Sequence, residues 1–335
     1  MRVLVTGGTG YVGSVSVERL LGAGHDVVVL DDLSTGHRAA LADGARLIEG
    51  SYADAATIGD LLAREPVDAL LHCAARSIVP ESLADPGRYF QENVGGGIVL
   101  LEAARQAGVR RVVFSSSAAV YGIPETTPVR EDAATRPINP YGETKRALEA
   151  VLSWYGVAYG FRAVSLRYFN VAGASAANGE VHRPETHLIP ILLAAVESGR
   201  PMTVYGDDYP TPDGTCIRDY IHVEDLADAH LAALEATAAD DPRTTPSPEQ
   251  GLLVCNLGSG SGFSVREVLA AASRVVGRTV PEVPGERRPG DPAVLVASSE
   301  RAGEVLGWSA RRSTLDEMIG SAWEWRQRHP DGYGD

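Results

Sequence analysis

Short apolar runs alternate with amphipathic stretches through the first half of the chain. Runs of strand length predict strands, and stretches with apolar positions three or four residues apart predict helices. Because apolar strands separated by helices form parallel sheets covered on both faces, the pattern predicts an α/β fold with a doubly wound, Rossmann-type parallel sheet. The predicted strands are Arg2–Thr6, Asp26–Leu30, Arg46–Glu49, Ala69–Cys73, Arg111–Ser115 and Ala163–Arg167. The predicted helices lie near Gly13–Ala23, Ala55–Glu65, Tyr89–Ala107 and Tyr141–Tyr155.

The pattern loosens after about Val171, where Pro- and Gly-rich loops separate shorter elements. We therefore expect a sheet domain over residues 1–171 and a smaller, mixed α/β domain over residues 172–335. The apolar run Leu252–Leu257 has the length of a strand and is expected to return to the main sheet.

Composition is that of a globular protein, with 335 residues, 44% of them hydrophobic, and a net charge of -14. This charge disfavours binding to nucleic acid or to an anionic membrane. The cysteines Cys73, Cys216 and Cys255 are scattered, which indicates buried thiols in a reducing compartment. Met1 leads directly into the first predicted strand, and no apolar run approaches the roughly 20 residues of a membrane span. A cytoplasmic protein is expected. No histidine pair shows metal-ligand spacing with a carboxylate, so no metal site is predicted.

Three glycines follow the first predicted strand at three-residue spacing. Gly7, Gly10 and Gly13 permit a tight turn and a close approach of a pyrophosphate to the backbone at the start of a helix. Asp31 ends the second strand 18 residues after Gly13, where its carboxylate can accept hydrogen bonds from an adenosine ribose. Because Asp31 and Asp32 would repel a 2′-phosphate, the sequence predicts NAD rather than NADP.

A tyrosine and a lysine stand four residues apart, hence on one face of a predicted helix. Asn139 and Pro140 provide its N-cap and first residue, which places Tyr141 in the first turn. A phenol with a pKa of about 10 is a poor base at neutral pH. The Lys145 ammonium, the helix N-terminus and an oxidised nicotinamide would each favour phenolate. The preceding strand ends in Ser115–Ser117, whose hydroxyls can bind a reacting oxygen. The pair predicts hydride chemistry at an alcohol carbon.

Motifs along nearly the whole chain resemble a known family. The motifs of the first half resemble the extended short-chain dehydrogenase/reductase family, and those of the second half resemble its UDP-glucose (UDP-galactose) 4-epimerases. The resemblance implies an NAD-dependent isomerase of carbohydrate and galactose metabolism, with residues 1–171 binding NAD and residues 172–335 binding the UDP-sugar. The first set is Gly7–Gly13, Asp31, Asn93, Ser115–Tyr121, Tyr141–Lys145 and Leu166–Gly173. The second set is Pro184–Pro190, Tyr205–Thr215, Arg218–Val223 and Arg287–Asp291.

The resemblance also implies the residues of the site. Tyr141 is the expected base, Lys145 its partner on the nicotinamide ribose, and Ser117 the hydroxyl that contacts the sugar O4. The helices near Tyr89–Ala107 and Tyr141–Tyr155 resemble those that pair across a homodimer. The expected cofactor contacts are Gly7, Gly10, Tyr11, Val12, Asp31, Asp32, Ser51, Tyr52, Cys73, Ala74, Ala75, Asn93, Ser115, Tyr141, Lys145 and Tyr168. The expected substrate contacts are Ser117, Tyr141, Asn170, His187, Leu188, Val204, Tyr205, Arg218, Tyr220, Arg288, Asp291 and Leu295.

Three positions depart from the family pattern. Ala119 replaces a frequent threonine, which removes one supporting hydrogen bond. Ser51 replaces an aspartate that contacts adenine. Ser77 replaces a lysine near the cofactor phosphates, with Arg76 beside it as a candidate substitute. These changes bear on rate and NAD affinity and remove no catalytic group.

Three other functions compete with this interpretation. A nucleotide-sugar 4,6-dehydratase needs acidic residues after the catalytic serine, where this chain has Ala118–Val120. A non-catalytic NAD sensor would be expected to lack Tyr141 or Lys145. A different sugar specificity stays open. The chain could be an epimerase for a UDP-N-acetylhexosamine such as UDP-N-acetylglucosamine, for a UDP-pentose, or for both kinds of sugar. The reason is that Leu295 stands where some members of the family carry a large aromatic residue that limits the size of the sugar.

Overall fold

Seven parallel strands form the main sheet of the computed structural model, which describes residues 1–244, 251–288 and 290–334. The strand order is β10-β6-β5-β4-β1-β2-β3, so the chain reverses direction across the sheet between β1 and β4. This order confirms the predicted doubly wound α/β fold. The strands are β1 (Arg2–Thr6), β2 (Asp26–Asp31), β3 (Arg46–Glu49), β4 (Ala69–His72), β5 (Arg111–Ser115), β6 (Arg162–Tyr168) and β10 (Leu253–Leu257).

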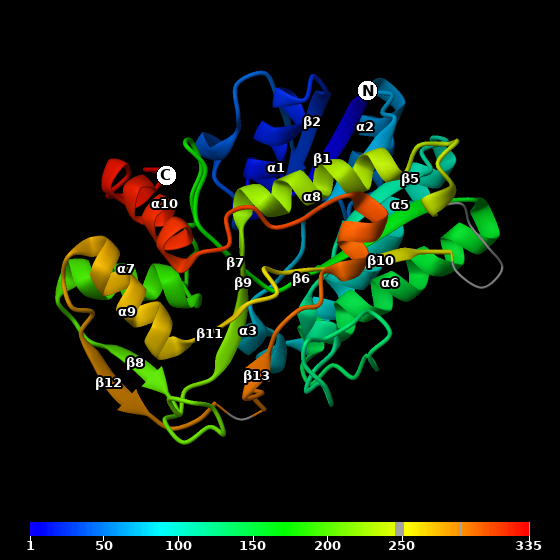
Figure 1. Ribbon diagram of the computed structural model, residues 1–335. Helices are drawn as coiled ribbons and strands as arrows, with labels where there is room; N and C mark the ends of the chain where they lie inside the picture. The colour runs from blue at the N-terminus through cyan, green and yellow to red at the C-terminus, as the bar shows by residue number, and fades with distance from the viewer. Residues whose placement is uncertain (245–250, 289, 335) are drawn as a thin grey trace.

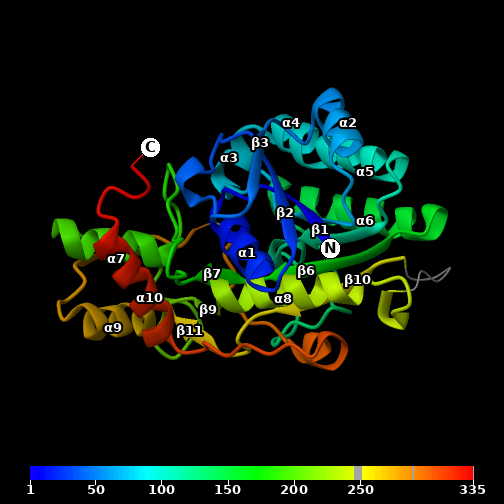
Figure 2. The same cartoon turned by 90° about the horizontal axis from the view of Figure 1, so that it is seen from above.

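Helices cover both faces of this sheet (Figure 2). Successive side chains of a strand point to opposite faces, so Val3 and Val5 join one apolar cluster and Leu4 joins another. The first cluster is completed by α1 (Tyr11–Gly22) and α8 (Val223–Ala236). The second is completed by α2 (Ala55–Arg64), α5 (Gly96–Gln106) and α6 (Pro140–Tyr159). Burial on both faces explains why these strands read as nearly continuous apolar runs.

The second half of the chain builds a smaller lobe beside the sheet, to the left in Figure 1. Three helices pack there with two small sheets around a separate core. Its helices are α7 (Leu188–Ser198), α9 (Val265–Val276) and α10 (Leu315–Arg328). Its strands are β7 (Asn170–Ala172), β8 (Met202–Tyr205), β9 (Ile217–His222), β11 (Gly262–Ser264), β12 (Glu282–Gly285) and β13 (Val294–Leu295). Between these segments the chain returns to the main sheet, because β10 pairs with β6 and α8 packs on α1.

The predicted helix near Tyr89–Ala107 is interrupted by a π-helical stretch. This stretch, η2 (Phe90–Gly95), contains Asn93 and lies between α4 (Pro86–Tyr89) and α5. Wide π turns recur at functional sites, because the extra residue re-aims the side chains beside it. The remaining elements are α3 (Val79–Ala84), η1 (Arg38–Ala40), η3 (Ala118–Val120), η4 (Pro242–Thr244) and η5 (Ala302–Leu306).

No helix in the described part of the chain combines the length and the hydropathy that crossing a membrane requires.

Candidate active site

The turn between β1 and α1 requires its glycines. Gly7 has a φ of 72°, and a Cβ there would lie 2.6 Å from the Ala74 backbone nitrogen. A Cβ on Gly13 would lie 1.9 Å from the Gly7 carbonyl oxygen. Gly10 caps α1 without a side-chain hydrogen bond, so the first backbone N–H groups of the helix, from Tyr11 and Val12 onward, remain available. The turn therefore fits an anionic group such as the pyrophosphate of a dinucleotide.

Asp31 is held in place by backbone donors at the end of β2. Its carboxylate accepts hydrogen bonds from Thr9 N at 3.0 Å and from Leu33 N at 2.9 Å. Asp32 next to it is exposed and accepts one from Ser34 N at 3.0 Å. The Thr9 hydroxyl is buried and has no hydrogen-bond partner among the residues that the structure describes. These groups can serve the polar ribose of a bound nucleotide.

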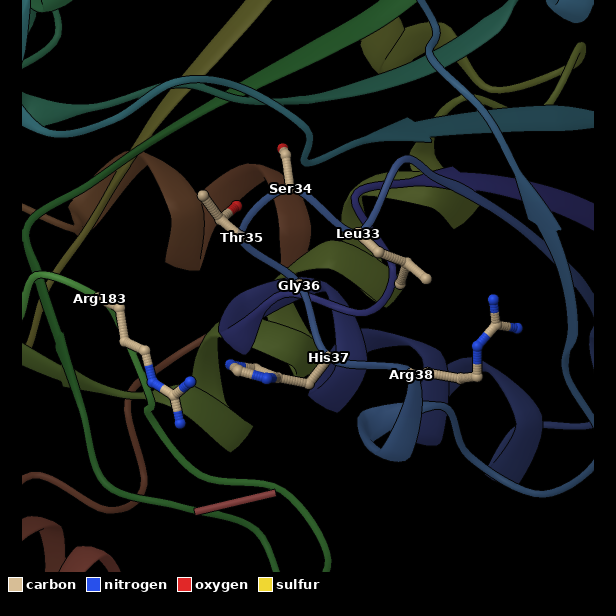
Figure 3. Close-up of a pocket in the computed structure, with 7 residues that line it drawn as sticks. All are labelled: Leu33, Ser34, Thr35, Gly36, His37, Arg38 and Arg183. Carbon is tan, nitrogen blue, oxygen red and sulfur yellow. The ribbon is translucent and has the colours of Figure 1, made fainter. Parts of the chain in front are cut away.

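A cavity of about 490 Å³ opens beside this loop. Figure 3 shows its lining, which is residues 33–38 together with Arg183 from the segment that precedes α7. Arg183 reaches toward His37 across the opening (Figure 3). The cavity therefore lies where the adenosine end of a dinucleotide would be expected from the position of Asp31.

The loop after β4 is held by Asn93. Asn93 accepts a hydrogen bond from Arg76 N at 2.8 Å and donates to Arg76 O at 2.9 Å and to Thr144 Oγ1 at 3.1 Å. The expected contacts Cys73, Ala74 and Ala75 follow β4 directly, and Ala74 N donates to Thr6 O at 3.0 Å. Asn93 thus ties the loop after β4 to α6.

Other expected cofactor contacts lie on neighbouring loops. Tyr52 donates to Glu92 O at 3.0 Å, and Ser51 accepts from Ala53 N at 3.2 Å. Arg76, considered as a substitute for the missing lysine, forms an ion pair with Glu92 at 2.5 Å.

Tyr141, Ser117 and Lys145 meet where β5 ends. Asn139 accepts a hydrogen bond from Gly142 N at 2.8 Å, which begins α6 as its cap and places Tyr141 in the first turn. The Ser117 side chain lies close enough to the Tyr141 phenol to lower its pKa. Lys145 Nζ donates to the Ser115 carbonyl at 2.7 Å and lies 5.8 Å from the centre of the Tyr141 ring. The structure therefore assembles a phenol, a hydroxyl and an ammonium at one point.

Burial opposes charge on both titratable groups. Burial raises the pKa of Tyr141, and the Ser117 side chain lowers it only in part. Burial lowers the pKa of Lys145 to about 8. The Lys145 ammonium, the helix N-terminus and an oxidised nicotinamide each favour the phenolate of Tyr141. Desolvation in the folded protein acts in the opposite direction and favours the phenol.

One set of expected substrate contacts lies on or beside the strands β7, β9 and β13. Asn170 is the register partner of Tyr220, and its side chain lies close enough to the Tyr220 phenol to lower its pKa, which burial raises. Arg218 donates to Asp291 at 2.6 Å and is the register partner of Leu295. Arg218 and Leu295 therefore lie on adjacent strands, where a guanidinium and an apolar side chain can contact different parts of one ligand.

A second set of expected substrate contacts lies on α7 and β8. His187 is the N-cap residue of α7, and Leu188 is its first residue. The Arg288 guanidinium lies 4.1 Å from the centre of the Tyr205 ring, a cation–π contact. Val204 is buried in the core of the small lobe, which leaves its backbone rather than its side chain for a ligand.

Two buried groups behind the site were missed in the sequence. Glu149 accepts hydrogen bonds from Ser116 Oγ and Ser165 Oγ, each at 2.7 Å, and from Arg167 Nη2 at 2.6 Å. His230 lies 2.9 Å from Ser115 Oγ, and burial lowers its pKa to about 3, so the ring is neutral. Glu149 stands four residues after Lys145, and this spacing was the available signal. Tyr168, an expected cofactor contact at the end of β6, is buried, and burial raises its pKa.

The similarity to known proteins extends over both lobes. A model of the NAD dependent epimerase/dehydratase family matches residues 3–245. The chain is 51% identical over 336 residues to the UDP-glucose 4-epimerase of Streptomyces lividans, covering 100% of this chain and 98% of that protein.

Two solved structures have the same fold. The UDP-glucose 4-epimerase from Brucella ovis in complex with NAD is 45% identical, with a TM-score of 0.90 over 97% of this chain and 98% of that one. The enzyme from Bifidobacterium longum in complex with NAD+ and UDP is 36% identical, with a TM-score of 0.91 over 99% of this chain and 100% of that one. The similarity therefore extends over the sheet and the small lobe alike.

Proposed function

The chain belongs to the NAD dependent epimerase/dehydratase family, and on this basis we propose that it interconverts UDP-glucose and UDP-galactose. The reaction inverts C4 of the sugar through a transient 4-keto sugar. The observation that carries the proposal is the meeting of Tyr141, Ser117 and Lys145 at the end of β5. A base, a hydroxyl that binds the reacting oxygen and a fixed cation are the groups that oxidation of a secondary alcohol needs.

Tyr141 moves a proton at the sugar O4 in this mechanism. Bound NAD would supply the hydride chemistry, taking hydrogen from C4 and returning it, with no net oxidation. Tyr141 removes the 4-OH proton and later gives it back, while Ser117 holds O4 by a hydrogen bond. Lys145 lies beside the Tyr141 ring, where its charge favours the phenolate against the burial that opposes it, and it would also hold the nicotinamide ribose of bound NAD.

The cofactor contacts are assigned by the same argument. The glycine turn with Tyr11 and Val12 binds the pyrophosphate, and Asp31 and Asp32 bind the adenosine ribose. Residues on the loops after β3 and β4, in η2 and at the ends of β5 and β6 line the rest of the cofactor. These residues are Ser51, Tyr52, Cys73, Ala74, Ala75, Asn93, Ser115 and Tyr168.

The substrate contacts hold the nucleotide more firmly than the hexose. Arg218 and Arg288 offer permanent positive charge to the diphosphate, as an acidic protein must do locally. The hexose is left free to turn, so that either face of the 4-keto sugar can be reduced. The other contacts assigned to the UDP-sugar are Asn170, His187, Leu188, Val204, Tyr205, Tyr220, Asp291 and Leu295.

An assay of purified protein tests the reaction. Wild-type protein is expected to convert UDP-glucose to UDP-galactose, and Tyr141→Phe to lose about 10² to 10⁴ in kcat while still binding UDP. Tyr141→Phe keeps the ring and its packing, so it removes only the hydroxyl. Unchanged turnover in this variant would refute Tyr141 as the base, and absence of any conversion by wild type would refute the reaction.

A second candidate activity is the epimerisation of UDP-N-acetylglucosamine or of a UDP-pentose. Leu295 favours it, because this half-buried leucine beside Arg218 is smaller than an aromatic ring. Wild type should then turn over UDP-glucose and UDP-N-acetylglucosamine at comparable rates in a panel of UDP-sugars. No turnover of the N-acetyl sugar, with UDP-glucose converted, would eliminate this activity and leave the first proposal standing.

We further propose that the protein is a cytoplasmic homodimer. Residues 1–171, together with the returning α8 and β10, would bind NAD, and the rest of residues 172–335 would bind the UDP-sugar. The dimer is supported by large apolar side chains that stay exposed on α3, η2, α5 and α6. The cytoplasmic location is supported by three unpaired cysteines. The exposed side chains are Leu83, Phe90, Ile98, Trp154, Val157 and Tyr159.

A further inference from the structure

Four metal-ligating side chains gather on the segment between β7 and α7, apart from the Tyr141 group. They are Glu180, His182, Glu185 and His187, and one ligand atom of each lies within 4.8 Å of all the others. Their spacing along the chain is two, three and two residues, the spacing of a loop. The sequence predicted no metal here, because only the folded segment brings these side chains to one point.

The distances within this cluster match those between ligands of one ion. His182 Nδ1 lies 3.2 Å from a Glu180 oxygen and 3.7 Å from a Glu185 oxygen. His187 Nδ1 lies 2.7 Å and 3.1 Å from oxygens of the same two carboxylates. Ligands about 2.0–2.1 Å from a tetrahedral zinc ion lie roughly 3.3 to 3.4 Å from one another, so the four distances fall on either side of this value.

His182 Nδ1 is close to carboxylates without being hydrogen-bonded to them. The atom is buried and has no hydrogen-bond partner in the described part of the chain, although a Glu180 oxygen is 3.2 Å away. Two atoms that face a common ion show this relation, because each directs its lone pair at the ion and not at the other. A buried nitrogen of this kind needs a partner, and a shared ion would supply one. His187 Nδ1, by contrast, lies 3.1 Å from Glu185 Oε1 in a direct hydrogen bond, which an ion would replace.

The surroundings of the cluster fix one of its ligands. Glu185 Oε1 accepts hydrogen bonds from Thr186 N at 2.7 Å and His187 N at 2.8 Å, which orients the carboxylate. Metal binding requires neutral imidazoles, and with them the two carboxylates carry a charge of −2, which one divalent cation cancels. Glu180, His182 and Glu185 also line a cavity of about 620 Å³, which gives an ion a path of entry.

We propose that Glu180, His182, Glu185 and His187 bind one divalent transition-metal ion, and that this ion is zinc. Two imidazoles with two carboxylates in a four-ligand arrangement suit zinc, and a site with all four positions filled by protein is structural. The His182 ring lies 6.4 Å from the Tyr11 ring at the start of α1, and His187 begins α7. The ion fixes segment 180–187 between these helices. It occupies Nδ1 of His187 and leaves Nε2 for the substrate.

Zinc binding to full-length protein without added histidines tests the site, in the absence of sugar. Competition with a chromophoric chelator should show one Zn²⁺ per chain with a dissociation constant of about 1 µM or tighter. Glu180→Gln and His182→Gln should each weaken binding by about 100-fold or more. His329→Gln, which removes an imidazole from the lining of the same cavity, should bind as wild type does.

Equal zinc affinity in wild type and in both ligand variants would overturn the proposal, since the ion would then lie elsewhere. Lack of binding by wild type would also overturn it, and would leave a cluster of protonated histidines paired with glutamates. If a variant fails to fold, wild-type crystals grown with zinc decide the matter by anomalous diffraction. A peak between the four side chains supports the site, and no peak there refutes it. None of these results depends on the epimerase reaction.

Discussion

The residues around Tyr141 and those around Arg288 meet the solvent differently. Tyr141 and Lys145 are 8% and 3% exposed, and Lys145 donates a hydrogen bond to the Ser115 carbonyl at the end of β5. Tyr205 is 42% exposed, and Arg288 stacks on its ring at the surface. Proton transfer requires a fixed geometry, whereas binding a charged nucleotide requires accessible donors. On the proposed assignment, a buried reaction centre is thus separate from an open binding surface, and substitutions should affect rate in the first and affinity in the second.

The largest effect on stability is expected from Glu149→Gln in the buried reaction centre. Glu149 and Arg167 form a buried ion pair at 2.6 Å, and the change leaves the Arg167 charge without a counter-charge. The free energy of unfolding should fall by about 3 to 5 kcal/mol. The rate should fall too, because Glu149 also fixes Ser116. Urea unfolding and kcat measure these effects.

Glu143→Gln on the same helix is the matched control for this experiment. Its ion pair with Arg146 is at the surface, so the free energy of unfolding should change by about 1 kcal/mol or less. An equal loss of unfolding free energy in Glu149→Gln and Glu143→Gln would show that the buried ion pair stabilises the protein no more than the surface pair does.

The next largest effect is expected from a substitution at the binding surface, which should raise KM. Arg218→Ala removes a charged donor from the UDP-sugar site and should raise KM for UDP-glucose by about 10- to 100-fold, with a smaller change in kcat. Arg278→Ala, an exposed arginine of the small lobe, is the control and should change neither. A fall in kcat at constant KM for Arg218→Ala would mean that Arg218 acts in the reaction centre. The proposed separation of the reaction centre from the binding surface would then be wrong.

Lys145→Met should abolish turnover and yet stabilise the protein without cofactor. Burial lowers the pKa of Lys145 to about 8, which means that holding its charge inside destabilises the fold at neutral pH. After allowing for the lost hydrogen bond to the Ser115 carbonyl, the gain at pH 7 should be about 1 to 2 kcal/mol.

The stability gain should depend on pH in a defined direction. Between pH 8 and about 10.4 the unfolded chain binds more protons than the folded one, so wild-type stability rises through this window. The advantage of Lys145→Met should therefore shrink as the pH rises. A variant that is less stable than wild type at pH 7 would contradict the account of burial.

The smallest effect is expected from Leu295→Tyr. A larger ring beside Arg218 should lower kcat/KM for UDP-N-acetylglucosamine relative to UDP-glucose by about tenfold. Leu295→Ile, of equal volume, should keep the wild-type ratio. An unchanged ratio in Leu295→Tyr would mean that another residue limits sugar bulk.

The main sheet could be predicted from sequence because its strands are buried on both faces. β1, β3 and β5 have the bounds that their apolar runs predicted, and the cap at Asn139 set the start of α6. The packing of α8 against α1 was not predicted, since an amphipathic face does not reveal which surface covers it.

The contacts of the site were less predictable than its motifs. Glu149 meets Arg167 only because α6 packs on β6, and the shift in the Tyr141 pKa follows from burial that no motif encodes. Glu180 and His187 meet through the path of a loop, for which the sequence has no periodic signal. Spacing predicts neighbours within an element, whereas tertiary packing decides neighbours between elements.

The fate of the C4 hydrogen tests the proposed reaction most directly. Wild-type protein would be supplied with UDP-glucose deuterated at C4, and the UDP-galactose formed would be examined by mass spectrometry and NMR. Because hydrogen leaves and returns as hydride inside a closed site, the product should keep its deuterium at C4. Replacement of the label by hydrogen from water would contradict the account, since C4 would then be inverted by proton abstraction.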